Sequence, residues 1–369
     1  MTDSLVQAYL PLFLWTGLGA ILLRVLPESL PRLLGRSLYW VGVPLEILAL
    51  ARQTHFSSQV GLAPIVTIAG LTSSLVLAWL SLQAVRSLSL SQVLPQVLPQ
   101  ANAENAAEAI AKEIVRDAAE AKTLETLAQP LTIPFPLAHE PALHSDPGSD
   151  PWQDRARRGS FILTSIFGNT GFVGLAIAPA FIDSAQASWL VIYSVTQNVV
   201  GTYGIGVFLA SYYGRSLQKS HWLMQIRDVL TVPSLWAFAI GYSTRSIGLP
   251  GAIELGIEAS VWVVIPAALL LMGMRLSQLH GWASLRLAMV PAFLKVVVSP
   301  LMVGLLTSLM GLMGDARLAL VLMAGMPSAF AGLILAEEYQ LDRELIASSI
   351  VLSTGMLLLT LPLWLVLFD

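Results

Sequence analysis

The chain has 369 residues, a formal net charge of −3 and no cysteine. Hydrophobic residues make up 55% of it and charged residues 12%, about half of the charged fraction that is usual in soluble domains. This composition indicates an integral membrane protein that crosses the bilayer several times. It argues against a nucleic-acid partner, because there is no basic excess, and against disulfides or Cys-ligated metals.

Ten apolar stretches are predicted to be transmembrane helices, which need about 20 residues each; the second stretch is shorter than this. No positively charged leader precedes the first stretch, so we expect this helix to be retained rather than cleaved as a signal peptide. The predicted spans lie at about 7–26, 37–52, 62–84, 160–182, 188–212, 228–247, 257–276, 286–311, 316–336 and 345–368.

The segment 86–158 between the third and fourth spans differs in kind. Residues 101–128 are rich in Ala and Glu, with charges at four-residue steps, which predicts a solvated helix. Five prolines between residues 130 and 147 predict an extended stretch after it. The linker is either a plain solvated loop or a binding segment.

The fourth span carries a polar break, Gly168-Asn169-Thr170-Gly171, inside an apolar run. Two glycines weaken a helix, and Asn and Thr offer hydrogen bonds where backbone bonds are lost. The ninth span repeats the design around Pro327 and Ser328. Such breaks are tolerated in a bilayer only inside protein or beside water. Kinked packing helices are the plainer interpretation, since Gly and Pro are common in membrane spans.

The two halves of the chain repeat. Phe172, Gly174 and Ala178 match Phe330, Gly332 and Ala336 in one register, in which Asn169 falls on Pro327. The early spans match at a different sequence offset. The extra length of the linker in the first half accounts for the difference between the two offsets. The matched pairs of the early spans are Pro11 with Pro233, Gly19 with Gly241, Trp40 with Trp262 and Pro44 with Pro266.

Five spans per unit place the copies in opposite orientations. We therefore predict an all-α membrane protein of ten transmembrane helices, an inverted five-plus-five repeat in which broken spans 4 and 9 cross near the midplane. The predicted divisions are 1–85 (spans 1–3), 86–158 (linker), 159–218 (spans 4–5) and 219–369 (spans 6–10).

Loop charges predict the orientation, because Lys and Arg concentrate in cytoplasmic loops. With the N-terminus outside, the inner loops hold most of the Lys and Arg, whether or not the linker is counted. Both termini are therefore expected outside, the linker in the cytoplasm, and the protein in the cell membrane (plasma or bacterial inner membrane).

Crossed broken helices present half-helix N-termini, which attract anions, to one point. The binding candidates there are Gly168, Asn169, Thr170, Gly171, Pro327 and Ser328, joined by Asn198 of the fifth span. Asn198 and its neighbours either line the cavity or hold helices together. Lys295 in the eighth span and Glu46 in the second are charges inside the membrane, where a functional or paired role is the default. They are candidates for a charge pair or for ion coupling; snorkelling towards an interface is the alternative.

Several of these motifs resemble the auxin efflux carrier family: residues 168–174, Met326-Pro327-Ser328-Ala329, Ala336-Glu337-Glu338-Tyr339, and the tail from Ser353-Thr354 to Leu361-Pro362-Leu363-Trp364. The resemblance implies ten spans, a scaffold of spans 1, 2, 6 and 7, and a moving core of the other six. It also implies an anionic substrate at the crossover: indole-3-acetate in plant members, malate, malonate and other carboxylates in bacterial ones. The plant proteins' Asn-Pro is absent here, since Thr170 follows Asn169, which puts an auxin-specific interpretation in doubt.

The function predicted from the sequence is secondary transport of small organic anions, carboxylates above all, by alternating access. The alternatives are a sodium-coupled carrier like the bile-acid symporters and a membrane sensor that does not transport. No hydrolase, metal or phosphate-binding motif is present, so neither enzymatic activity nor a cofactor is expected. The expected partners are an organic anion and the lipid bilayer, and a homodimer is a possible assembly.

Overall fold

The computed structural model describes residues 2–27, 29–53, 60–97, 152–214, 222–278 and 283–368. It separates into two compact units, Met1–Leu82 with Asp154–Asp369, and Gln83–Gln153. Most of the predicted linker, including its charged helix and its proline-rich stretch, lies outside the described residues.

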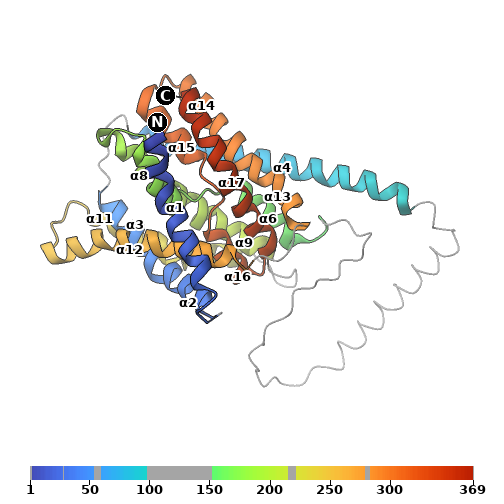
Figure 1. The fold of residues 1–369 in the computed structure, drawn as a ribbon, viewed down its shortest axis with the longest axis horizontal. Coiled ribbons are helices and arrows are strands. Elements are labelled where there is room, and N and C mark those ends of the chain that lie inside the picture. The colour runs from blue at the N-terminus through green and yellow to red at the C-terminus, as the bar shows by residue number, and fades with distance from the viewer. Residues whose placement is uncertain are drawn as a thin grey trace, which may run out of the picture. The chain divides into compact units, whose positions relative to one another are not determined.

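The described regular structure is helical, without strands (Figure 1). The helices up to the middle of the chain are α1 (Thr2–Leu22), α2 (Leu30–Ser37), η1 (Leu38–Gly42), α3 (Val43–Gln53), α4 (Leu62–Val97), α6 (Arg155–Ile166), η2 (Thr170–Gly174), α7 (Leu175–Ile177), η3 (Ala178–Ala180), η4 (Ser184–Gln186), α8 (Ala187–Thr196), η5 (Gln197–Gly206) and α9 (Val207–Gly214). Those that follow are α10 (Trp222–Leu230), α11 (Pro233–Thr244), α12 (Gly251–Leu276), α13 (Ala283–Phe293), η7 (Leu294–Val298), α14 (Ser299–Leu309), α15 (Gly314–Ala324), α16 (Ala331–Tyr339) and α17 (Arg343–Phe368).

Within the described residues, five helices are long and apolar enough to cross a membrane. The bent pair α10 and α11, with an angle of 54° between its parts, makes a sixth if it is one span. The predicted fourth and ninth spans are each divided by a break, so neither is one long helix. The count of ten spans therefore stays a prediction. The five helices are Leu30–Gln53, Leu62–Leu88, Gly251–Leu276, Ser284–Leu309 and Arg343–Phe368.

Helices α1, α3, α11 and α12 pack against one another through glycines. A Cβ added at Gly19 would lie 2.0 Å from the carbonyl oxygen of Leu270, and one at Gly241 would lie 2.8 Å from that of Leu48. Small residues allow membrane helices this close an approach. The register that aligns Gly19 with Gly241 also aligns Leu48 with Leu270, so the two contacts are equivalent, as a duplicated unit requires.

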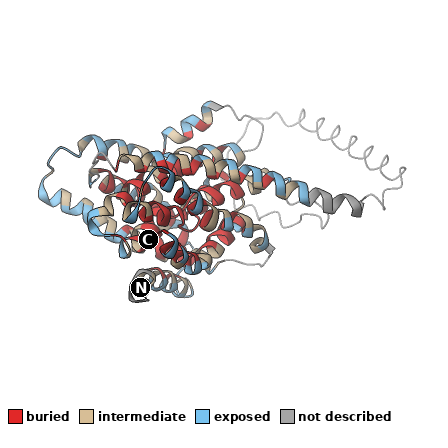
Figure 2. Ribbon diagram, turned by 90° about the horizontal axis from the view of Figure 1, so that it is seen from above, coloured by how far each residue is buried: buried red, intermediate tan, exposed pale blue. Residues whose placement is uncertain are grey.

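Buried residues gather in the middle of the ribbon (Figure 2). Several helices outside the first group pack against one another as a second group. Helix α13 packs against α17, α14 against α15, and α6 against α9. Helix α4 joins this group, since Ser74 Oγ donates to Ser299 Oγ at 3.4 Å. The first group comes from the predicted scaffold spans and the second from the predicted core spans; movement of one group relative to the other stays a prediction.

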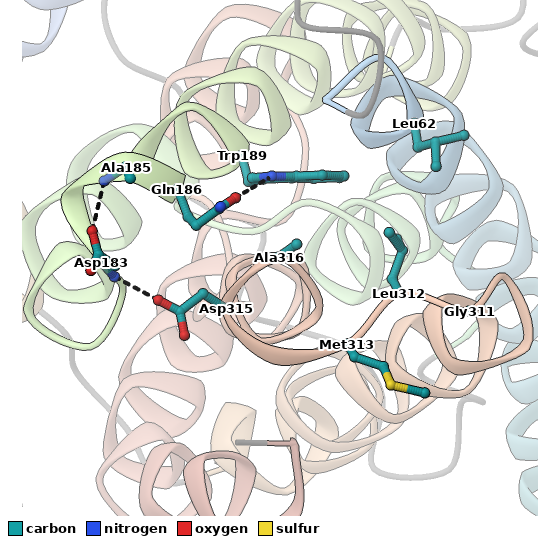
Figure 3. A pocket seen from close by; sticks show the side chains of 10 residues that line it. All are labelled: Leu62, Asp183, Ala185, Gln186, Trp189, Gly311, Leu312, Met313, Asp315 and Ala316. Carbon is teal, nitrogen blue, oxygen red and sulfur yellow. Dashed lines mark hydrogen bonds between the residues drawn. The ribbon is translucent and has the colours of Figure 1, made fainter.

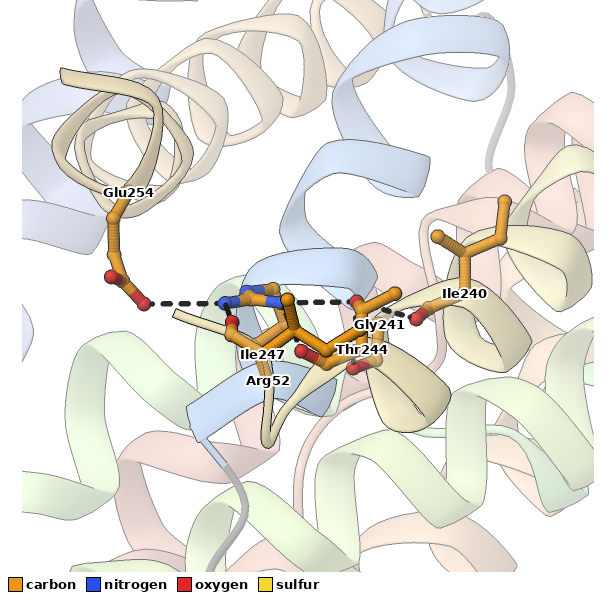
Figure 4. A network of polar contacts seen from close by, with 6 residues as sticks. All are labelled: Arg52, Ile240, Gly241, Thr244, Ile247 and Glu254. Atoms are coloured by element: carbon orange, nitrogen blue, oxygen red, sulfur yellow. Dashed lines mark hydrogen bonds and ion pairs between the residues drawn. The ribbon is translucent and has the colours of Figure 1, made fainter. Parts of the chain in front are cut away.

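Polar contacts join loops that the predicted topology places on one side of the membrane. Arg52 binds the carbonyl oxygens of Thr244 and Ile247 and pairs with Glu254 at 3.3 Å (Figure 4). The backbone N–H of Asp183 donates to Asp315 at 2.7 Å, beside a hollow of about 640 Å³ (Figure 3). On the side predicted to be cytoplasmic, Arg157 pairs with Asp342 and Arg275 with Glu337.

Candidate functional site

The two breaks contact each other directly. Residues Gly168 and Ser328 form an isolated antiparallel bridge. The N–H of Asn169 donates to the carbonyl oxygen of Pro327 at 2.7 Å, and the N–H of Ala329 donates to that of Phe167 at 2.8 Å. Each break thus satisfies backbone groups of the other, which is what a non-helical segment at membrane depth requires.

The two breaks differ in length. The first leaves three residues, 167–169, between α6 and η2, and the second leaves six, 325–330, between α15 and α16. Proline lacks an N–H, so Pro327 takes part in the crossing only as an acceptor. The repeat aligns Asn169 with Pro327 as equivalent positions, and in the structure these two residues share a hydrogen bond.

Asn169 caps the half-helix that begins at Thr170. Its Oδ1 accepts from the N–H of Phe172 at 3.4 Å, which leaves Nδ2 as the free end of the amide. Within the described part of the chain that Nδ2 has no hydrogen-bond partner, although the residue is only 4% exposed. A buried amide donor without a partner is costly and calls for an explanation.

Side chains from neighbouring helices fix the shape of the crossing. Gln197 Nε2 donates to the carbonyl oxygen of Gly168 at 2.8 Å. Ser328 Oγ donates to the carbonyl oxygen of Thr164 at 2.8 Å, while the N–H of Ser328 donates to Ser353 Oγ at 3.0 Å. Gln197 is one of the polar neighbours of Asn198 for which the sequence left two roles open, lining the cavity or holding helices together. Ser353 was noted only as part of the family motif, and its role at the crossing was not predicted.

Thr170 and Asn198 lie on one hydrogen-bonded chain. Asn198 Nδ2 donates to Ser194 Oγ at 3.3 Å, and Ser194 Oγ donates to Thr170 Oγ1 at 3.4 Å. All of the predicted binding residues are thus brought together at or beside the crossing. Their part in binding a substrate stays a prediction.

Lys295 lies against the first break, not at a membrane interface. Its side chain is 1% exposed, and its Nζ donates to the carbonyl oxygen of Ala324, the last residue of α15. A Cβ at Gly168 would lie 2.8 Å from Lys295 Cε and 3.1 Å from Nζ. The ammonium group therefore stabilises the negative end of one half-helix while it touches the break in the other.

Glu46 lies near Gly171, whereas Lys295 lies near Gly168. Glu46 is 2% exposed, and its Oε1 has no hydrogen-bond partner among the described residues. A Cβ at Gly171 would lie 3.1 Å from this oxygen and 3.3 Å from Asn198 Nδ2. Glu46 and Lys295 form no ion pair with each other. The structure therefore does not show the predicted charge pair, and a role in ion coupling stays a prediction.

Four π-helical segments surround the crossing. Segment η2 follows Asn169, η5 starts with Gln197, η7 contains Lys295, and η1 directly precedes the helix of Glu46. Such segments are frequent at functional sites because they shift side chains relative to a regular helix. In the part of the chain that the structure describes, no group of three His, Asp or Glu could hold a metal ion.

Comparison with known proteins identifies the family. A family described as membrane transport protein, that of the auxin efflux carriers, matches residues 153–365. The chain belongs to this family. The match begins just before α6 and contains both breaks, Gln197 and Lys295, and it confirms the resemblance seen in the sequence motifs.

Two archaeal relatives, each named as an uncharacterized transporter, are similar to part of the chain. The protein of Methanocaldococcus jannaschii is 26% identical over 211 residues, which cover 56% of this chain and 67% of the relative. That of Methanothermobacter thermautotrophicus is 28% identical over 199 residues, which cover 53% of this chain and 63% of the relative. With its family, this makes the chain an integral membrane protein of a transporter family.

Proposed function

We propose that this protein is a secondary transporter of small organic anions, carboxylates above all, which bind where the two broken helices cross. The observation that carries the proposal is the Nδ2 of Asn169, a buried donor without a partner beside the crossing. A carboxylate oxygen is an acceptor and would satisfy it.

The surroundings favour negative charge at this point. The half-helix from Thr170 to Ala180 is capped by Asn169, so the positive end of its dipole lies at the crossing. Lys295 adds a full positive charge beside Gly168. Partial charges, a full charge and a free donor together suit an anion better than a cation.

The conformation described here is closed around this point, since Asn169 is 4% exposed and Thr170 and Ser328 are fully buried. A substrate would reach the crossing only if the two groups of helices move relative to each other. The scaffold and core each pack internally, as alternating access between two rigid bodies requires. Because the crossing belongs to the core, the bound anion would move with the core.

Purified protein in liposomes tests this proposal. Radiolabelled mono- and dicarboxylates, malate and malonate among them, should enter wild-type vesicles faster than protein-free ones, and Asn169→Ala should lose most of this flux. Uptake that follows a sodium gradient alone would favour the sodium-coupled alternative. Binding without any flux would favour the sensor.

A further inference from the structure

The charge state of the Glu46 carboxyl group affects whether an anion can bind at the crossing. Its carboxyl group is buried on the scaffold side of the crossing, with Oε1 unpartnered and close to Gly171. An ionised carboxylate at that place would repel the anion proposed to bind a few residues away. Glu46 must then be neutral whenever the anion is bound.

Among the residues that the structure describes, no basic side chain pairs with Glu46. Arg52, on the same helix, is engaged by Thr244, Ile247 and Glu254, and Lys295 is engaged by Ala324. Tyr203 on η5 is a buried titratable group near Glu46. The other titratable groups on the elements around α3 are Tyr39 on η1, Tyr193 on α8, Tyr242 on α11, and Glu254, Glu258 and Arg275 on α12.

We infer that Glu46 is a proton-binding site that couples anion transport to protons; the inference rests on the proposed function. The proton comes from the water on the side that the substrate enters, forms an O–H bond on the Glu46 carboxylate, and leaves to water on the other side after the anion departs. One proton crosses with each turnover of Glu46, and nothing is oxidised or reduced.

A proton suits this place better than a metal cation. Sodium would need a cage of several oxygen atoms, whereas a Cβ at Gly171 would meet Glu46 Oε1 and Asn198 Nδ2, and the second of these is a nitrogen that donates its hydrogens. A protonated Glu46 needs no cage, and its O–H can donate to the anion itself. Glu46 lies on α3 of the scaffold and Gly171 on the core, so movement of the core would change the surroundings of the carboxyl group.

The test uses wild type, Glu46→Gln, Glu46→Asp and Glu258→Gln in liposomes with radiolabelled malate and malonate. Glu258 is the matched control, an exposed glutamate on the scaffold helix α12. In wild type, vesicles alkaline inside should accumulate the probe about tenfold per pH unit for each proton carried. Glu46→Gln, which is permanently neutral, should lose this accumulation but keep exchange of labelled for unlabelled probe. Glu258→Gln should behave as wild type.

Three flux results would overturn the inference: accumulation by Glu46→Gln as in wild type, loss of both accumulation and exchange in Glu46→Gln and Glu46→Asp alike, or accumulation in wild type driven by sodium instead. Infrared difference spectra give a reading that does not depend on flux. Addition of malate to wild type should produce a carboxylic-acid signal that Glu46→Gln lacks. If the infrared signal appears but no flux is measured, the proposed transport is refuted and the proton site at Glu46 stands. If neither the signal nor any flux is observed, the proposed transport and the proton site are both refuted.

Discussion

Replacement of Asn169 by Ala separates the folding role of this residue from its binding role. In folding, the side chain accepts one long hydrogen bond, 3.4 Å from the Phe172 nitrogen. A helix cap contributes about 0.5–2 kcal/mol, and a bond of this length belongs at the lower end. The mutation also removes a buried donor that lacks a partner, which offsets part of the loss. We expect the free energy of unfolding to change by less than about 1 kcal/mol.

The expected effect on binding is larger. A hydrogen bond to a charged group contributes about 1.5–3 kcal/mol, so loss of the Nδ2 donor should weaken carboxylate binding about 10- to 150-fold. The assays are the concentration dependence of uptake in liposomes and thermal unfolding in detergent. Thr360→Val is the matched control, because Thr360 also holds a buried, unpartnered polar atom but lies on α17. Wild-type affinity and rate in Asn169→Ala would refute the assignment of the crossing as the site.

Three further predictions concern other parts of the chain. Lys295→Met should abolish carboxylate uptake and Lys295→Arg should keep part of it, because the charge at the end of α15 is lost in one and displaced in the other; wild-type uptake in Lys295→Met would contradict this. In this Cys-free chain, an impermeant thiol reagent should label a cysteine at Asp183 from outside and one at Gln340 only after permeabilisation; the reverse would refute the orientation. Arg52→Met should lower the unfolding temperature more than Glu254→Gln, because Arg52 also binds two carbonyl oxygens while the Glu254 side chain is 47% exposed; equal shifts would contradict this.

The sequence located the crossing because breaks in apolar spans are visible as composition. Two glycines around Asn169 and Thr170, and a proline at Pro327, stand out in a membrane span, and the repeat brings them into register. The same repeat aligned Gly19 with Gly241 as equivalent positions, and in the structure these glycines make equivalent contacts, with Leu270 and with Leu48. Glycine and proline affect the backbone directly, so patterns built on them carry over to structure.

Side-chain partners and bends were harder to predict. The bond from Gln197 to the Gly168 carbonyl depends on the π-helical turn of η5, which sets the direction of Gln197 and has no simple sequence pattern. The sixth span was predicted as one helix, but Val232 is extended, with φ −68° and ψ 118°. The residue before a proline is disfavoured in the helical conformation, and Pro233 therefore begins a new helix at 54° to α10.

The positions of the two buried charges give them different parts in transport. Lys295 and the crossing that it touches both belong to the core, so the ammonium group would stay beside Gly168 in every state of a rigid core. Glu46 belongs to the scaffold, so its distance from Gly171 would change whenever the core moves. A charge that moves with the site can offset the anion but cannot report which side the site faces. A charge on the other body can be sensitive to the conformation, and this is the property that a coupling residue needs.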